Sequence, residues 1–277
     1  TYTVPSVANF NLAHNSRNEH FELMMLSLKS INLHYQQQMF SGYISQFHLL
    51  NFNTTIGLSY SINSFDKLSL DDNPYDTLFF VRNNQLTPFV HVEYDNLDDN
   101  YFAKHGVKAR VTGRYHIEPK TKDRTVDIGY ALQGYITPGN GRFTIIPQMY
   151  GRILSTSTLY FNLWNTLGGE IAGRHLEEQL PFIGIASTLP EDDMVNVVRC
   201  DLRYNFYGKH YLTAMYNTVI GIYKQFSRIR INAFEKQGAG LKYSFNSPLG
   251  PISLTAQWAN IDGKNKFGGY FSFGYTF

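Results

Sequence analysis

Apolar and polar residues alternate with a period of two along much of this chain, which is the pattern of a strand with two different faces. In residues 107–118 the apolar positions are Val107, Ala109, Val111, Tyr115 and Ile117, with polar or charged residues between most of them. Residues 198–206 repeat the pattern, with Arg199, Asp201 and Arg203 on the charged face. These runs have roughly 10–14 residues, whereas strands of globular sheets commonly have about 5–6 and transmembrane strands about 9–11. The pattern therefore predicts an all-β fold, a transmembrane antiparallel β-barrel.

Candidate strands occur along the whole chain, separated mostly by short connections. About sixteen strands of about 10 residues each fit within 277 residues, so we expect a closed barrel of about 16 strands. A long loop is expected near 156–194 and a shorter one near 223–237. The candidate strands are 2–13, 20–29, 31–40, 42–51, 53–63, 75–83, 86–96, 107–118, 124–137, 142–155, 195–207, 209–222, 238–246, 251–260 and 267–277.

Composition narrows the class of protein. The chain has 24 Lys plus Arg and 22 Asp plus Glu, a net charge of +2, which gives no reason to expect a nucleic-acid partner. One cysteine cannot form a disulfide framework, and no apolar run approaches the length of about 20 residues that a transmembrane helix needs. The first five residues do not resemble a signal peptide. We expect residues 1–277 to form a single barrel domain, with any N-terminal periplasmic or catalytic domain absent from this chain.

The sequence contains none of three common catalytic or metal-binding motifs. No Gly-x-Ser-x-Gly, His-x-x-x-His or His-Glu-x-x-His pattern occurs, so we predict no catalytic residue, no metal site and no cofactor. His91 and Glu93 share a strand face, as do His116 and Glu118, and both pairs fit the polar wall of a lumen. Cys200 lies on an apolar face, where a small hydrophobe is a better interpretation than a nucleophile.

Three segments are more specific than alternation alone. The first carries Tyr94, Asp95, Leu97, Asp98, Phe102 and Gly106 at fixed spacing. The second, in the long loop, carries Gly168, Gly169 and Arg174. The third runs from Gly238 through Gly240, Ser247, Pro248, Gly250 and Pro251 to Ile252. In order and spacing these segments resemble about the last nine strands of the Omp85 superfamily of outer-membrane barrels, over residues 86–277.

The resemblance implies a place in the outer membrane of a Gram-negative bacterium, in contact with outer-membrane lipids and lipopolysaccharide. It implies that residues 94–106 form a periplasmic turn. It also implies a C-terminal β-signal, which the barrel-assembly machinery reads during biogenesis. The residues that fit this signal are Lys266, Gly268, Phe271, Phe273 and Phe277.

In that family the arginine of the loop motif folds back into the lumen and pairs with an acid on a strand. Arg174 is the matching arginine, but Asn217 stands where the acid is expected. The nearest lumenal acid is Asp201, one strand earlier. Asp201 and Asn217 are therefore the two possible partners of Arg174, and the departure argues for a relative with a relaxed loop contact.

A set of basic residues is expected to line the lumen: Lys108, Arg110, Arg114, Arg199, Arg203 and Lys242. One interpretation is a cationic lining that passes anions or grips an acidic segment. The favoured interpretation is internal ion pairing with Glu93, Asp127 and Asp201.

Three functions remain open from the sequence. The stretch Glu178–Gly184 looks like the C-terminal barrels of patatin-like lipolytic outer-membrane proteins, which suggests a membrane anchor and translocation domain of a larger protein. The alternatives are a pore for protein insertion or two-partner secretion, and a passive pore that prefers anions. The first two imply a polypeptide client or partner subunits, and any lipase activity would reside in another domain.

Overall fold

The computed structural model describes residues 9–24, 30–45, 51–67, 82–139, 141–156, 160–173, 176–191, 193–225 and 228–274. Within these ranges, no helix is long and apolar enough to cross a membrane. Twelve strands form one sheet: β1 (Asn9–Met24), β2 (Ser30–Ser45), β3 (Phe52–Lys67), β4 (Arg82–Asp95), β5 (Gly106–Ile117), β6 (Arg124–Tyr135), β7 (Phe143–Thr156), β11 (Met194–Tyr207), β12 (His210–Gln225), β13 (Arg228–Ser247), β14 (Gly250–Ile261) and β15 (Lys264–Phe273). The connection from β7 to β11 contains the 3₁₀ helix η2 (Phe161–Leu163) and the short strands β8 (Thr166–Leu167), β9 (Gln179–Leu180) and β10 (Leu189–Pro190).

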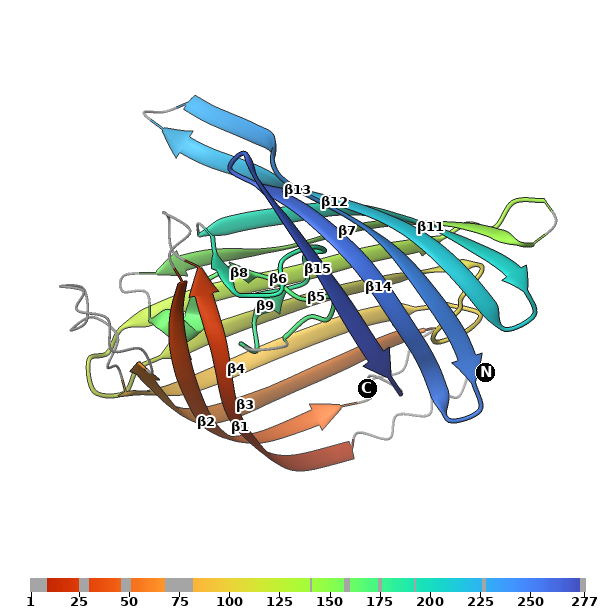
Figure 1. Cartoon of the computed structure of the whole chain (residues 1–277). Coiled ribbons are helices and arrows are strands. Elements are labelled where there is room, and N and C mark those ends of the chain that lie inside the picture. Colours follow the sequence, from red (N-terminus) through yellow and green to blue (C-terminus); the bar gives the residue numbers. More distant parts are fainter. Residues whose placement is uncertain are drawn as a thin grey trace.

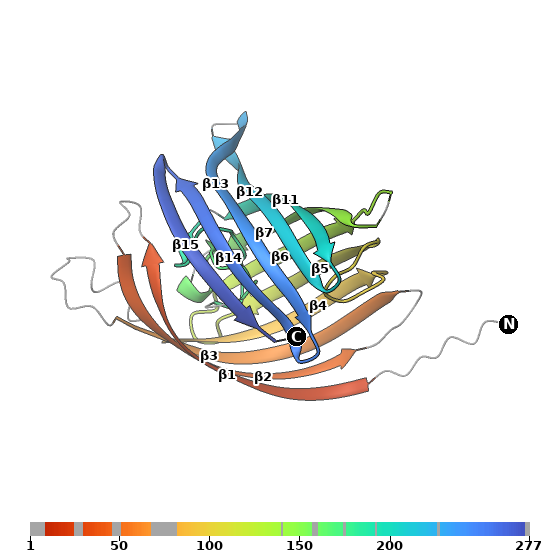
Figure 2. The same cartoon turned by 45° about the vertical axis from the view of Figure 1, so that its right-hand side comes forward.

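The large sheet follows the chain order from β1 to β15, with β7 paired to β11, and each neighbouring pair is antiparallel. The sheet curves strongly, so that β1–β4 lie on one side and β13–β15 on the other (Figures 1 and 2). We call the enclosed space the lumen. In the described residues the ladder ends at β1 and at β15, with no pairing between those two strands.

The predicted all-β fold is confirmed, but the strands of the large sheet are fewer and longer than expected. Fifteen strands lie in the described ranges, of which twelve, with 10 to 20 residues each, form this sheet. The expected strands 31–40 and 42–51 contribute to the single strand β2, and 2–13 and 20–29 contribute to β1. The loop expected near 223–237 instead contains the ends of β12 and β13. Residues 75–81 of another expected strand lie outside the described residues.

The difference has a physical cause. Polar residues continue on both faces of a strand once it leaves the apolar belt of a membrane, so period-two alternation does not mark the strand ends. β12 and β13 show the greater length of the strands, because together they project as a hairpin beyond their neighbours (Figure 1). Because each strand is longer than expected, the same number of residues forms fewer strands.

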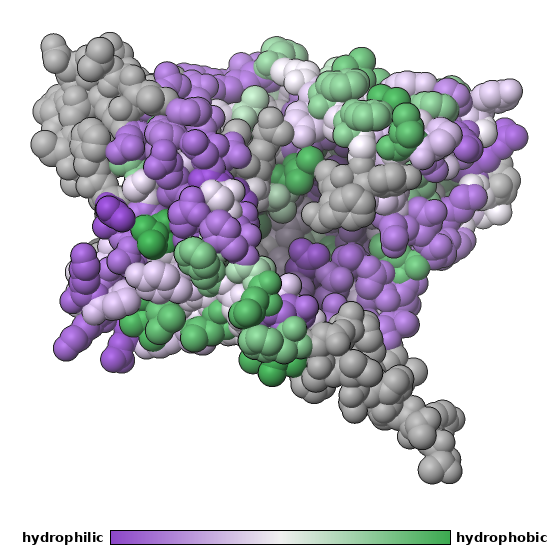
Figure 3. Space-filling view, turned by 90° about the horizontal axis from the view of Figure 1, so that it is seen from below, coloured by the Kyte–Doolittle hydropathy of each residue, from purple (hydrophilic) through white to green (hydrophobic). Residues whose placement is uncertain are grey.

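The two faces of the sheet are chemically opposite to those of a soluble sandwich. Large apolar side chains face outward, as at Leu58, Leu132 and Leu254, which are 48%, 50% and 61% exposed. Polar and charged side chains face the lumen and are buried, as at Asp127 and Arg152. The space-filling view shows a hollow between the two sides of the molecule, with polar residues around part of it (Figure 3). This inversion is the arrangement of a barrel wall whose outer face meets lipid.

The connection between β7 and β11 occupies the lumen, where β8 and β9 lie inside the curve of the sheet (Figure 1). We call its residues 160–191 the inner loop. Apolar side chains of the loop, Leu167, Phe182, Ile185 and Leu189, form a core with barrel residues that include Val197. A second cluster joins Phe161 and Leu176 of the loop to Leu33, Tyr35 and Phe65 of β2 and β3. The long loop predicted at 156–194 is thus an internal element with its own packing.

Candidate functional site

The inner loop is tied to the first strand of the sheet. The backbone N–H of Thr188 donates to the carbonyl oxygen of Glu22 at 2.8 Å. The guanidinium of Arg17 donates to the carbonyl oxygen of Gly173 at 2.7 Å. Both contacts join the loop to β1, so the loop reaches the strand at one edge of the large sheet.

A buried arginine on β7 forms the centre of the second attachment. Arg152 is 1% exposed and donates from Nε and Nη2 to the two carboxylate oxygens of Asp127 on β6, at 2.9 Å each. Its remaining nitrogen, Nη1, donates to the carbonyl oxygen of Leu163 at 2.8 Å and to Oδ1 of Asn165 at 3.3 Å. A two-pronged guanidinium–carboxylate pair is a strong and directional contact. Arg152 therefore binds the wall and the loop at once.

The neighbouring strand β5 extends this attachment. Arg114 pairs in register with Asp127 and donates to its Oδ2 at 3.1 Å and to Oε2 of Glu178 in the loop at 2.8 Å. His116, also on β5, lies 3.5 Å from Asp127 and 3.0 Å from the hydroxyl of Thr87. We call Arg114, His116, Asp127, Arg152 and Glu178 the charge network. Two arginines and two carboxylates balance within it, which offsets the cost of burying these charges.

A second acidic residue of the loop contacts the opposite wall. Glu170 forms an ion pair with Lys242 of β13 and accepts a hydrogen bond at 2.5 Å from the amide of Gln257 on β14. The same Gln257 accepts a hydrogen bond from the backbone N–H of Gly184 at 3.0 Å. Near the loop exit, Lys236 of β13 lies 2.5 Å from Glu191. The loop is thus held from two sides of the lumen.

Backbone packing at β13 requires glycine. A Cβ at Gly238 would overlap the carbonyl oxygen of Ile183, and a Cβ at Gly184 would overlap that of Trp258. Inside the loop, Gly169 has a φ of +72°, and its N–H donates to the carbonyl oxygen of Ile185 at 2.7 Å. These glycines belong to the motifs singled out in the sequence, and their location explains the residue type.

The predicted partners of the loop arginine occupy different surroundings. Arg174 itself lies outside the described residues. Asp201 accepts two hydrogen bonds at 2.7 Å from Arg199 on its own strand. Asn217 is fully buried, and neither its Nδ2 nor its Oδ1 has a hydrogen-bond partner among the described residues. The pairing of Arg174 with either residue stays a prediction.

The basic residues expected in the lumen meet acids or aromatic rings. Lys108 lies 2.8 Å from Asp95, and Arg110 lies 2.8 Å from Glu93. Arg203 donates to the carbonyl oxygen of Ala103, and its guanidinium lies between 5.7 and 5.9 Å from three aromatic ring centroids. The three rings are those of Phe102, Tyr135 and Tyr211. Together with Arg114, Arg199 and Lys242, described above, all six predicted lining residues make such contacts.

The β4–β5 turn, residues 96–105, contains several of the predicted turn residues. Asp95 accepts from the backbone N–H of Leu97 at 3.0 Å, and Asp98 accepts from the N–H groups of Lys104 and His105 at 2.8 and 3.1 Å. Gly106 has a φ of +119°. Two further residues of the motif are aromatic. The ring of Phe102 stacks on that of Tyr211, with ring centroids 4.2 Å apart, and the ring centroid of Tyr94 lies 4.9 Å from that of Phe52. The turn therefore folds toward β11 and β12.

The predicted β-signal residues lie on the last strand of the sheet. Lys266, Gly268, Phe271 and Phe273 belong to β15, and the two phenylalanines are 65% and 60% exposed on the outer face. Phe277 lies outside the described residues. Recognition of this segment by an assembly machinery stays a prediction.

Sequence reasoning missed Arg152, Glu170 and Glu178 as lumenal contacts. The alternation of β7 did offer a signal for Arg152. It lies at an even-numbered position, on the same inner face as Tyr150 and Leu154, whereas the odd-numbered Met149 faces outward. The two glutamates lie in the loop, where no period applies, so nothing in their spacing reveals which wall they meet.

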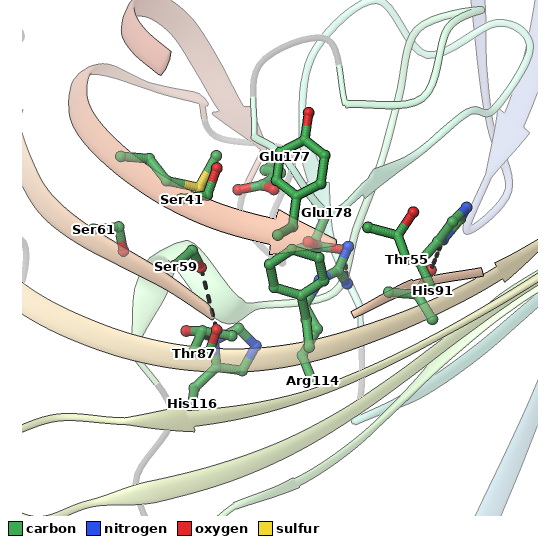
Figure 4. Close-up of a pocket in the computed structure, with 14 residues that line it drawn as sticks. Ser41, Thr55, Ser59, Ser61, Thr87, His91, Arg114, His116, Glu177 and Glu178 are labelled. Carbon is green, nitrogen blue, oxygen red and sulfur yellow. Dashed lines mark hydrogen bonds and ion pairs between the residues drawn. The ribbon is translucent and has the colours of Figure 1, made fainter. Parts of the chain in front are cut away.

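A cavity of about 270 Å³ lies between the wall formed by β2–β5 and the loop. Figure 4 shows Glu177 and Glu178 entering from the loop, with Thr87, His91, Arg114 and His116 on the strand side. Among the described residues, no group of three or more His, Cys, Asp or Glu is arranged to hold a metal ion. The contacts of the site are suited to holding a loop and to non-covalent binding.

A family model described as the OMP85 superfamily matches residues 6–277. No curated protein sequence matches the chain. A solved structure, BamA from Haemophilus ducreyi lacking POTRA domains 1–3, is similar with a TM-score of 0.66 and 14% identity, covering 95% of this chain and 58% of that one. At this identity the likeness concerns the fold, and this chain spans little more than half of the BamA chain.

Proposed function

Because the chain belongs to the OMP85 superfamily, and is thus an outer-membrane protein of Gram-negative type, we propose that it acts as the membrane anchor and translocation domain of a longer protein. We propose further that residues 1–277 are one barrel domain with a lumen closed by the inner loop. The observation that supports this is the attachment of the loop to β1, to β5–β7 and to β13–β14. A lumen filled in this way favours a gated barrel over a passive pore.

Planar-bilayer conductance tests this proposal. We expect small or rare conductance steps from the wild-type protein, and large steps when residues 166–188 are replaced by a short Gly-Ser linker. Arg174→Ala tests the predicted lumenal role of that arginine, and we expect it to raise the frequency of opening. Large, stable, anion-selective steps from the wild type would contradict a closed lumen and support the passive pore with its cationic lining.

A finer proposal is that the longer protein is patatin-like. Its support is the likeness of Glu178–Gly184 to barrels of that group, together with the place of this stretch in the inner loop. We expect the barrel alone to have no phospholipase activity, because no Gly-x-Ser-x-Gly motif occurs in it. Phospholipid turnover by the purified barrel would contradict this, and the gene sequence encoding the full protein would identify any lipolytic domain.

Protein insertion or secretion is the alternative function. The observation that favours it is that β1 and β15, the two ends of the large sheet, do not pair with each other in the described residues. Reconstitution of the protein in lipid vesicles tests it, with folding of an unfolded outer-membrane barrel as the readout. Acceleration of client folding by this chain would support insertion, and an unchanged rate would leave the anchor proposal standing.

A further inference from the structure

The cavity of about 270 Å³ borders the charge network at Arg114, His116 and Glu178, and the rest of its wall is rich in hydroxyl groups. Ser41, Tyr43 and Thr55 line it from β2 and β3. No hydrogen bond joins their side-chain hydroxyls to another described residue, whereas Thr87 and Thr112 in the same wall lie within hydrogen-bond distance of histidines. The cavity thus presents three available acceptors on one side.

The loop contributes a carboxyl group whose charge is not balanced. Within the charge network, Arg114 and Arg152 are matched by Asp127 and Glu178. Glu177 also lines the cavity, and no described Lys, Arg or His lies within ion-pair distance of its carboxylate. Arg17 is a more distant cation that already binds Gly173. Glu177 is therefore an acid of this cavity that forms no ion pair with any of the described residues.

The environment of Glu177 makes a cation favourable there. The side chain of Glu177 is exposed to the cavity; partial loss of water around it, and then the neighbouring Glu178 carboxylate, raise the pKa of its carboxyl against the opposing charges of Arg114 and Arg17. A positive ligand beside Glu177 would offset both effects, since an opposite charge stabilises the ionised form of a carboxyl.

Two aromatic side chains complete the cavity. Tyr43, Gly57 and Phe89 are directly opposite one another on β2, β3 and β4. A Cβ at Gly57 would lie 2.6 Å from both the Phe89 ring and the Cβ of Tyr43, so the glycine lets these two side chains approach each other across β3. The faces of aromatic rings attract cations, which adds to the attraction of the carboxylate.

From these groups we propose that the lumen cavity is a binding site for a primary ammonium group, held by Glu177, the hydroxyls of Ser41 and Thr55, and the rings of Tyr43 and Phe89. A primary ammonium has three N–H donors for these acceptors. A quaternary ammonium has none, so it would keep the attraction of its charge to Glu177 and to the rings but would lose every hydrogen bond. An anion would meet Glu177 and Glu178, and Arg114, the arginine that the described residues place in the cavity wall, already pairs with Asp127 and Glu178. The ammonium group can come from a lysine side chain of a polypeptide or from an ethanolamine headgroup.

Ligand-detected NMR on the purified protein in a neutral maltoside detergent tests the proposal. The probes are n-butylammonium, its neutral analogue n-butanol and tetramethylammonium. For so small a ligand we expect a Kd of about 1 mM for n-butylammonium, and at least tenfold weaker binding of the other two. Equal binding of n-butanol would overturn the proposal.

Variants locate the site. Glu177→Gln is expected to weaken n-butylammonium binding about tenfold, and Phe89→Leu about two- to fivefold. Thr55→Val removes one acceptor without changing charge and is expected to weaken binding about threefold. Asp262→Asn, in the exposed β14–β15 turn, is the matched control and should bind as the wild type does. Wild-type affinity in both Glu177→Gln and Thr55→Val, with unchanged thermal stability, would overturn the assignment.

Two larger probes distinguish the sources of the ammonium group. Nα-acetyl-lysine methylamide represents a polypeptide, and glycerophosphoethanolamine represents a lipid headgroup. The probe that binds with the lower Kd identifies whether the ammonium group comes from a polypeptide or from a lipid headgroup. Failure of both to compete with n-butylammonium would overturn a biological role for the site.

Discussion

At the scale of single residues, glycines determine how closely the inner loop approaches the barrel wall. At Gly238 the backbone of β13 meets the carbonyl oxygen of Ile183 with no room for a Cβ. Gly184 stands in the same relation to Trp258, and its φ of +91° also disfavours other residues. Gly184 belongs to the loop and Gly238 belongs to the wall. The close approach of the loop to the wall therefore requires the absence of a Cβ on both sides of the contact.

Gly238→Ala is expected to displace the loop from β13. Overpacking of this kind costs about 1–3 kcal/mol, and we expect a lower Tm together with faster proteolysis within residues 160–191. Gly113→Ala is the control, because a Cβ at Gly113 would meet nothing within 4 Å. A Gly238→Ala protein as resistant to protease as the control would contradict the close approach.

Asp98 supports a pH-dependent prediction for the β4–β5 turn. The carboxyl of Asp98 is exposed; a slight loss of water around it by itself raises its pKa, but the N–H groups of His105 and Lys104 outweigh this effect and lower the pKa below its usual value. A carboxyl with a lowered pKa stabilises the fold above its unfolded pKa, and this contribution is lost as the pH falls through the folded pKa.

We therefore expect Asp98→Ala to lower the Tm at pH 7 by roughly 2–4 °C. The difference from the wild type should shrink at about pH 3, where the carboxyl is largely protonated in both states. Thermal unfolding in detergent at the two pH values measures this, with Asp262→Asn as a control acid in another turn. A difference independent of pH would show that the charge of Asp98 is not involved.

At the scale of elements, strands β5, β6 and β7 act together on the inner loop. Their lumenal faces bring Arg114, Asp127 and Arg152 into one buried network, although none of these residues adjoins another in sequence. The loop supplies Glu178 and the backbone carbonyl of Leu163. The wall is therefore preformed by the register of three neighbouring strands, and the loop completes it.

Removal of Arg152 tests this element. Arg152→Ala leaves Asp127 buried without its main partner, and such a change typically costs about 3–5 kcal/mol. Arg152→Lys keeps the charge but cannot form the two-pronged contact, so we expect an intermediate loss. Denaturant unfolding and protease cleavage of the inner loop measure both variants.

An exposed arginine–glutamate ion pair on the same wall provides the control for the Arg152 variants. Arg110 pairs with Glu93 on the same wall, but its side chain is 50% exposed. Exposed pairs contribute about 0–1 kcal/mol, so Arg110→Lys should change stability by less than Arg152→Lys. Equal effects would indicate that the buried network does not hold the loop.

At the scale of the whole molecule, the direction of each side chain decides whether it meets lipid or the lumen. Leu132 and Gln133 are neighbours on β6 that face opposite sides, with Leu132 50% exposed on the outer face. Their substitutions therefore probe the same depth of the sheet from two environments.

Leu132→Arg is expected to impair folding into lipid vesicles, because an arginine on the lipid face costs up to about 2–4 kcal/mol near the bilayer midplane. Gln133→Arg adds the same side chain on the lumenal side and should fold in nearly wild-type yield. The folded fraction is measured by the mobility of unheated and heated samples in gel electrophoresis. Equal yields would contradict the assignment of the two faces.

The sequence alone determined the strand content and the sidedness of the wall. Alternation placed Val111 and Leu202 outward and Arg114 and Asp201 inward; in the structure Val111 and Leu202 are exposed, whereas Asp201 is buried and Arg114 pairs with buried Asp127. It predicted the extent of the long loop, because alternation stops between β7 and β11. It did not fix the number of strands in the large sheet, since a run of polar residues such as the glutamines at 36–38 in the middle of β2 leaves no local mark of where one strand ends.

Only the tertiary structure decided what the long loop does. Glu178 lies 64 residues from Arg114, and Glu170 lies 87 residues from Gln257. These contacts depend on the return of the loop into the lumen and on the register of strands that lie apart in the sequence. A period of two assigns each strand residue to a face, but it carries no information about which loop residue will meet that face. The physical reason is that burial inside the lumen pairs charges through space, whereas alternation records only the local direction of each side chain.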